Sequence, residues 1–218
     1  MHRKIGFGLL WLGFLVYAFL FAPPDDPKTL ALITHLSTGQ WDSINPLVIA
    51  LFNIMGVLPF IYCAVLFVDG QGQKIWAFPF AIGSFFLGAF ALLPYLALRQ
   101  PNPTVSGELN LSLKVLDSRW LGIVLSAIAL VLVGWGFSQG NWSDFVQQWQ
   151  SSRFIHVMSL DFCLLSSVFP AVLGDDMARR GLVNSTVFWV VALIPLFGPL
   201  AYLCIRPPLV AGSASAQT

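Results

Sequence analysis

The sequence predicts an all-α membrane protein, a bundle of about six transmembrane helices that forms one domain over residues 1–208. Two observations support this fold class. Of the 218 residues, 57% are hydrophobic and only 10% are charged, whereas a soluble domain typically has about 25% charged residues. Long runs that are apolar on every side recur along the chain. They lack the alternating polarity of barrel strands, so helices are expected.

Each predicted span is about 18–23 residues long, which matches the hydrocarbon core of a bilayer. The first follows a basic start, MHRK, like a signal peptide, but it is too long and lacks a small-residue cleavage pattern, so we expect a retained helix. Pro170, Pro195 and Pro199 interrupt the last two spans. The six spans are Ile5–Ala22, Pro46–Val68, Trp76–Leu98, Trp120–Phe137, Phe154–Leu173 and Val183–Ile205.

The connections are short. The segment PKTLALITHLSTGQW in the first connection predicts an interfacial helix, and Asn141 is typical of a helix N-cap. The tail, residues 209–218, is small and polar and is expected to be disordered. No internal repeat is convincing, because the two halves show no matching pair of broken segments.

The orientation of six spans is ambiguous. With both termini inside, five basic residues lie inside and six outside, so the positive-inside rule does not decide. We favour termini inside, because the first helix often dominates and it carries Arg3 and Lys4. The pair Arg179 and Arg180 argues the other way.

Asp161 is the first candidate functional residue. It lies deep in the fifth span, where a carboxylate is costly unless it is paired, protonated or next to a wet cavity. Asn53 in the second span is a plausible partner. Asp161 could form a structural bond between helices or serve a proton, ion or ligand. We expect the fifth span to contact more helices than any other and the first span to be peripheral.

His156 lies one turn inside the fifth span. It could be an axial ligand of haem or chlorophyll, or an interfacial histidine with its hydrogen bonds satisfied. On a helical wheel it projects nearly opposite to Asp161, so the two do not form a dyad. No second buried histidine is visible, and we expect no cofactor.

The segment GDDMARRG is the densest charge cluster, with Asp175, Asp176, Arg179 and Arg180. Two acids beside two arginines suggest a metal–diphosphate site, but such a site needs further carboxylates at helical spacing. We therefore expect a solvated turn and no metal site.

No catalytic motif is present, so no enzyme activity and no catalytic residues are predicted. The net charge of +1 gives no nucleic-acid footprint. The three cysteines lie in apolar runs, which is typical of packing residues rather than disulfides. The expected partners are the lipid bilayer and other membrane proteins.

Two segments carry a resemblance: SSRFIHVMSLDFCLLSSVFPAVLGDDMARRG and FWVVALIPLFGPLAYLCIRPPL. They resemble uncharacterised multi-spanning membrane proteins of cyanobacteria and plastids. The resemblance covers the last third of the chain and implies a plasma or thylakoid membrane in a photosynthetic organism. It offers no catalytic residues.

Two functions remain open. The first is a non-enzymatic accessory, scaffold or assembly factor of a photosynthetic membrane complex. The second is a small-solute, ion or proton carrier that uses Asp161, which requires a water-reachable cavity at that residue. A sealed carboxylate bonded to a neighbouring helix would argue against a carrier.

Overall fold

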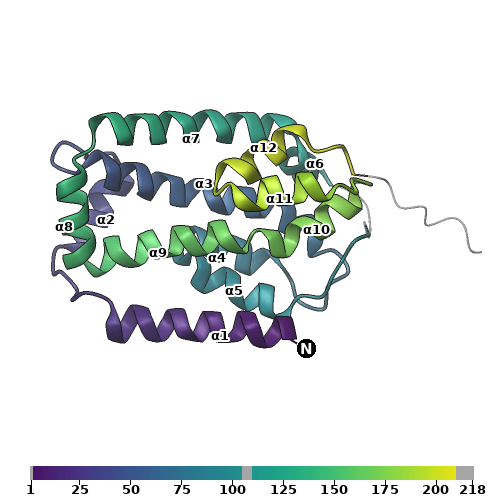
Figure 1. The fold of residues 1–218 in the computed structure, drawn as a ribbon, viewed down its shortest axis with the longest axis horizontal. Helices are drawn as coiled ribbons and strands as arrows, with labels where there is room; N and C mark the ends of the chain where they lie inside the picture. The colour runs from purple at the N-terminus through teal and green to yellow at the C-terminus, as the bar shows by residue number, and fades with distance from the viewer. Residues whose placement is uncertain (1, 105–109, 210–218) are drawn as a thin grey trace, which may run out of the picture.

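A computed structural model describes residues 2–104 and 110–209, and these form a bundle of helices (Figure 1). Four helical stretches are long and apolar enough to cross a membrane. They run side by side along the bundle, and successive ones point in opposite directions. They are α1 (His2–Val16) with the π-helix η1 (Tyr17–Phe21), α3 (Pro46–Asp69), α7 (Arg119–Gln139), and α9 (Arg153–Val168) with α10 (Pro170–Arg179).

The predicted third span is a hairpin rather than one helix. Helix α4 (Phe78–Leu87) ends at Gly88, and α5 (Ala89–Leu98) returns antiparallel to it. The rings of Phe80 and Tyr95 lie 5.7 Å apart across the hairpin. The hairpin therefore starts and finishes at one end of the bundle and turns part-way along it.

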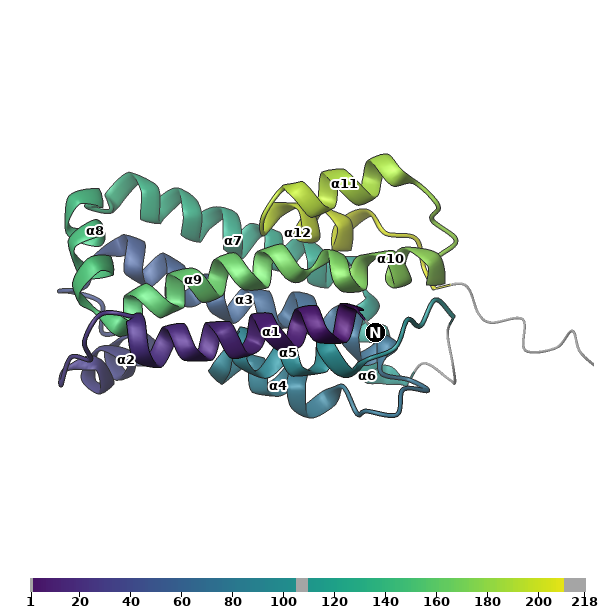
Figure 2. The same cartoon turned by 60° about the horizontal axis from the view of Figure 1, so that its bottom comes forward.

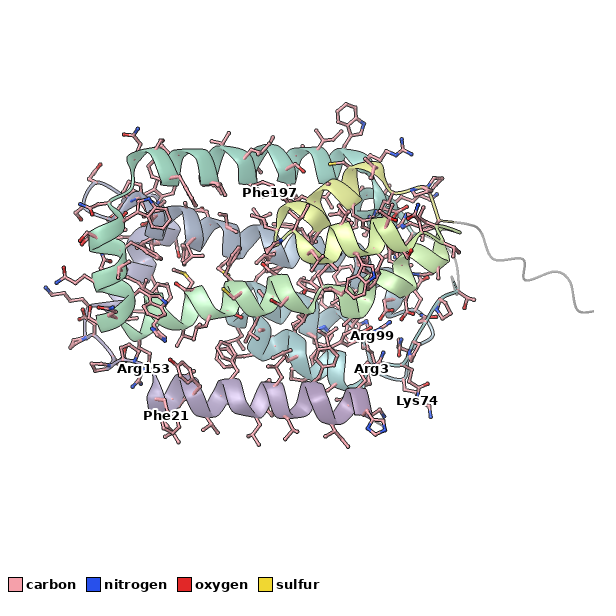
Figure 3. All side chains as sticks on the ribbon, in the orientation of Figure 1. Arg3, Phe21, Lys74, Arg99, Arg153 and Phe197 are labelled. Carbon is pink, nitrogen blue, oxygen red and sulfur yellow. The ribbon has the colours of Figure 1, made fainter. Side chains whose placement is uncertain are left out.

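The predicted sixth span is a second hairpin, made of α11 (Ser185–Leu193) and α12 (Phe197–Ile205). The turn includes Pro195, which has no N–H to continue α11, and Leu196, whose φ is +60°. Phe197 at this turn lies near the middle of the bundle's length in Figure 3. The described chain thus has four long apolar helices and two shorter hairpins, which differs from six continuous spans.

Short helices cover the two ends of the bundle. At the end away from the termini lie α2 (Thr29–Thr38) and α8 (Trp142–Ser151), and at the other end lies α6 (Leu111–Asp117) (Figure 2). Helix α2 confirms the predicted short helix. The side chain of Asn141 accepts from the N–H of Asp144, which confirms the predicted N-cap. Of the predicted tail, only Leu209 lies among the described residues.

Helix α3 occupies the centre of the bundle, and most of its side chains are buried. It packs against α4, α6, α7, α8, α9, α10 and α12, whereas the fifth span packs against fewer neighbours. The prediction that the fifth span contacts most helices is therefore wrong. The core requires an apolar helix there, and α3 is more apolar than α9. Helix α1 packs mainly on α5 and leaves its outer face exposed, so the first span is peripheral as predicted.

The prediction that the chain has no internal repeat is also wrong. Each half has a long helix, a short helix across the far end, a second long helix and a returning hairpin, in that order. Both halves run in the same direction, so the repeat is parallel. Residues 64–101 and 171–208 correspond at a constant separation of 107 residues. Ten positions are identical, among them Asp69 and Asp176, Tyr95 and Tyr202, and Arg99 and Arg206.

Candidate functional site

Asp161 lies at the turn of the first hairpin. Its Oδ1 accepts a 2.7 Å hydrogen bond from the backbone N–H of Ala89, the first residue of α5. The first N–H groups of a helix have no partner within the helix and carry partial positive charge, so they favour a carboxylate at this position. The side chain is only 6% exposed. Its Oδ2 has no hydrogen-bond partner among the described residues.

Gly88 makes this approach possible. Its φ of 52° and ψ of −128° are open to glycine and strained for other residues. A Cβ on Gly88 would collide with the carboxylate of Asp161. The break in the predicted third span and the buried acid of the fifth span are therefore two parts of one feature.

A cavity of about 440 Å³ opens beside Asp161. It lies between the end of α1, helix α3, the hairpin turn and α9. The walls are mainly apolar, and Asp25 and Arg153 are the other charged residues that line it. Six aromatic residues contribute to the lining: Phe19, Phe52, Phe85, Phe86, Phe90 and Phe154.

A second cavity, of about 280 Å³, lies at the equivalent place in the other half. Helix α9 contributes Phe154, Val157, Met158 and Asp161 to the first cavity, and α3 contributes Leu47, Ala50, Leu51 and Ile54 to the second. Each pair is separated by the same 107 residues. The hairpin turns correspond in the same way, since Gly88 and Phe90 match Pro195 and Phe197. The two cavities are counterparts within the repeat.

Asn53 does not pair with Asp161. Its Nδ2 donates to the carbonyl of Ile49 one turn earlier in the same helix, at 2.8 Å. A buried amide can satisfy itself in this way, so the predicted contact between the two polar residues is wrong.

Both ring nitrogens of His156 are already bonded to protein groups. Nδ1 lies 2.9 Å from the carbonyl oxygen of Trp149, which can only accept, so Nδ1 carries the proton. Nε2 therefore accepts from the hydroxyl of Tyr17 at 2.8 Å. The ring also stacks on Trp149, with centroids 4.3 Å apart. This arrangement matches the interfacial histidine with satisfied hydrogen bonds and leaves no nitrogen free for an axial metal bond.

The charges of GDDMARRG belong to a buried ion-pair cluster at the end of the bundle that holds the termini. The prediction of a solvated turn is wrong, because Asp176, Arg179 and Arg180 lie within or directly after α10 and are at most 4% exposed. Opposite charges from the end of α3, from α6 and from the base of the second hairpin compensate for this burial. The ion-pair cluster comprises Asp69, Arg99, Asp117, Asp175, Asp176, Arg179, Arg180 and Arg206.

In the first half, Asp69 at the end of α3 binds the base of its hairpin. Its Oδ2 accepts from the hydroxyl of Tyr95 and from Nε of Arg99, each at 2.7 Å. Arg99 also pairs with Asp175. Burial opposes the charge on Arg99, but bonds and attraction from Asp69 and Asp175 outweigh it and hold the pKa of Arg99 above its ordinary value.

In the second half, Asp176 repeats the position of Asp69. Its Oδ2 accepts from the hydroxyl of Tyr202 at 2.7 Å and lies 3.5 Å from Nη1 of Arg206. Arg180 adds a bond of 2.8 Å to Asp176 and one of 2.6 Å to Asp117. Burial alone would lower the pKa of Arg180, but these two carboxylates raise it above its ordinary value.

The two halves of the cluster are joined through Arg179, whose Nη1 lies 3.1 Å from Asp69 and whose Nη2 lies 3.5 Å from Asp176. The four acids and four arginines balance, so the cluster is neutral as a unit. Removing one member of such a buried set leaves an uncompensated charge, which is strongly destabilising. The ion-pair cluster therefore links the bases of both hairpins to α3 and α10.

Within residues 2–104 and 110–209, no three metal-ligating side chains come together. No protein-family model, curated protein or solved structure matches the chain. The sequence located Asp161 but missed the cavity, the hairpin and the ion-pair cluster. The 107-residue register of the Asp–Tyr–Arg set is the pattern from which the cluster could have been found.

Proposed function

We propose that the protein is an integral membrane carrier that binds a small solute in the cavity beside Asp161. The observation that carries this proposal is a buried aspartate, Asp161, that lines a cavity at the turn of a broken helix pair and makes a hydrogen bond through only one carboxylate oxygen among the described residues. A carboxylate at this depth is costly, so it is expected to serve a function when part of it remains unpaired. Asp161 is bonded to the start of α5 and also lines a cavity, and this cavity supports the carrier over a purely structural carboxylate.

The parallel repeat and the two hairpins support the same function. Transporters are often built from repeated halves, and their substrate sites lie near the middle of the bilayer where helices are interrupted. Here both hairpin turns lie part-way along the bundle and border the two cavities. The likeness is one of architecture, so it adds to the argument from Asp161 and does not replace it.

The four long helices are proposed to cross the bilayer, with both termini in the cytoplasm. Nine of the eleven basic residues lie at the end of the bundle that holds the termini, and only Lys28 and Arg153 lie at the other. This asymmetry follows the positive-inside rule. The balance in the six-span prediction arose because that topology assigned Arg153 to the side of the termini and assigned five basic residues to the opposite side: Arg99, Lys114, Arg119, Arg179 and Arg180. The plasma or thylakoid membrane of a photosynthetic organism belongs to the proposal and is supported by the resemblance alone.

The ion-pair cluster gives this carrier fixed hairpin bases. Charged pairs hold the bases at the cytoplasmic end, while the turns at Gly88 and Pro195 have mainly apolar surroundings. Opening of the Asp161 cavity then requires movement of a hairpin turn or of the adjoining end of α1. That end is the π-helix η1, a rare element that is frequent at functional sites.

A cavity-filling substitution tests the proposal. Gly56 lines the cavity, and a Cβ there meets no atom within 4 Å, so Gly56→Leu is expected to fill the cavity without disturbing the backbone. Gly134→Leu on the exposed face of α7 is the matched control. Binding to protein in lipid nanodiscs is measured with three six-carbon probes: hexyltrimethylammonium, hexane-1-sulfonate and hexan-1-ol.

We expect at least one probe to bind the wild type and Gly134→Leu but not Gly56→Leu. If a charged probe binds, it should also exchange across proteoliposomes faster than across protein-free vesicles. Equal binding to both glycine variants, or no binding at all, overturns the carrier. The accessory or scaffold function would then be the remaining proposal, tested by co-purification of a membrane complex.

A further inference from the structure

The repeat supplies an internal comparison for the Asp161 cavity. The counterpart of Asp161 in the second cavity is Ile54, and the counterpart of Gly88 is Pro195. Among the described residues, none that lines the second cavity is charged. The two cavities share their position in the fold, and at the helix position that faces the hairpin turn one has a carboxylate where the other has Ile54.

The second hairpin shows that the turn does not need an acid. Its backbone is bonded locally: the N–H of Gly198 donates to the carbonyl of Ile194 at 2.9 Å, and the N–H of Leu200 donates to Leu196 at 3.1 Å. In the first hairpin Oδ1 of Asp161 would suffice for the turn, and a neutral asparagine oxygen could accept the same bond from Ala89. Neither the negative charge nor Oδ2 is therefore needed to form the hairpin turn.

We infer that the ligand of the Asp161 cavity is an organic ammonium ion with an apolar body. This inference rests on the proposed function and names its substrate class. The carboxylate of Asp161, whose Oδ2 has no hydrogen-bond partner among the described residues, lines the cavity, and phenylalanine rings, which can attract cations, line its walls. The apolar lining suits the body of the ligand.

The other charged residues on the cavity wall do not alter the acidic character of the end where Asp161 lies. Arg153 lies two helical turns from Asp161 along α9, about 12 Å at 1.5 Å per residue. Its Nε is bonded to the carbonyl of Pro23 at 3.0 Å. Asp25 lines the same end of the cavity as Arg153, and the opposite charges of the two side chains offset each other. At the deep end of the cavity, Asp161 is therefore the acidic group that a ligand meets.

The test replaces the charge and keeps the shape. Asp161→Asn preserves an acceptor for Ala89 and removes the charge, and Asp42→Asn makes the same change at an exposed residue that does not line the cavity. Both proteins are purified at full length in lipid nanodiscs, and thermal unfolding confirms that they are folded. Calorimetric titration then compares hexyltrimethylammonium, hexane-1-sulfonate and hexan-1-ol, with empty nanodiscs subtracted for partition into lipid.

The wild type and Asp42→Asn should bind the ammonium probe, and Asp161→Asn should bind it at least about tenfold more weakly, a difference of about 1.4 kcal/mol. The sulfonate should bind more weakly than the ammonium to the wild type. Ammonium binding that survives Asp161→Asn, or equal binding of the alcohol or the sulfonate, overturns the inference. Binding of the alcohol that Gly56→Leu abolishes would refute the cationic ligand while leaving the cavity as the carrier's site.

Discussion

The hydroxyl of Tyr95 donates a 2.7 Å hydrogen bond to Oδ2 of Asp69, and both side chains are fully buried. The second half repeats this relationship with Tyr202 and Asp176 at the same distance. In both halves the tyrosine follows the aspartate by 26 residues, and the paired arginine follows it by 30. A returning hairpin of fixed length brings the three residues together each time.

The paired tyrosines should contribute similarly to stability. Tyr95→Phe and Tyr202→Phe each remove a donor to a buried carboxylate, a bond worth about 1.5–3 kcal/mol. Each variant should lower the free energy of unfolding in detergent by that amount. Trp189→Phe, at an exposed site on α11, is the control and should have little effect. A large loss in one half and none in the other would show that the two sets are not equivalent.

Arg99 should be among the most sensitive positions in the chain. Arg99→Met leaves Asp69 and Asp175 without their shared cation, and breaking such a buried pair costs about 3–5 kcal/mol. Arg119→Met at the same end of the bundle removes an exposed arginine and should change stability by less than about 0.5 kcal/mol. Chemical unfolding monitored by tryptophan fluorescence measures both. Equal stability of the two variants would show that the ion-pair cluster does not stabilise the fold.

Gly88 should not tolerate a side chain. Gly88→Ala strains the backbone by about 1–3 kcal/mol and also brings a Cβ onto the carboxylate of Asp161. Gly134→Ala, in the interior of α7 with open space around it, should instead stabilise the helix by about 0.8–1 kcal/mol. Thermal unfolding of the two variants should shift in opposite directions. A neutral Gly88→Ala would contradict the described hairpin turn.

The sequence was sufficient to predict the all-helical class. It was not sufficient to predict the path of the chain, and the reason is physical. Hydropathy registers how apolar a segment is but not whether it continues or returns, so ten-residue arms such as α4 and α5 look like one span. The breaks at Gly88 and Leu196 depend on single backbone conformations that composition does not reveal. Burial of Asp176 and Arg180 was missed because the groups that complete their bonds, Tyr202 and Asp117, lie in distant segments.

Asp161 was found from the sequence because its cost depends on local depth alone. The hydrogen-bond partner of Asp161 was not found from the sequence, because it is the backbone N–H of Ala89 and not the polar side chain of Asn53. Backbone donors become available only where a helix starts, and the start of α5 was hidden inside a predicted span. The cavity depends on packing among four elements and has no signature in any one of them.

The last prediction concerns the path of the chain across the bilayer. Four crossing helices with two returning hairpins place Ser112 and Val183 on the side of the termini and Ser143 on the other side. Six crossing helices would give the reverse for all three residues. Single cysteines at these exposed positions, in a protein whose Cys63, Cys163 and Cys204 are replaced by alanine, distinguish the two arrangements.

Membrane-impermeant maleimide applied to intact cells should label Ser143→Cys only, because its side is expected to face outward. Ser112→Cys and Val183→Cys should be labelled only after the membrane is made permeable, as should a cysteine added at the N-terminus. If Ser112→Cys and Val183→Cys react in intact cells while the N-terminal cysteine does not, an odd number of segments crosses before each of them, so α4 and α5 cross the bilayer as one span. The hairpin reading of that segment, and with it the equivalence of the two cavities, would then fail.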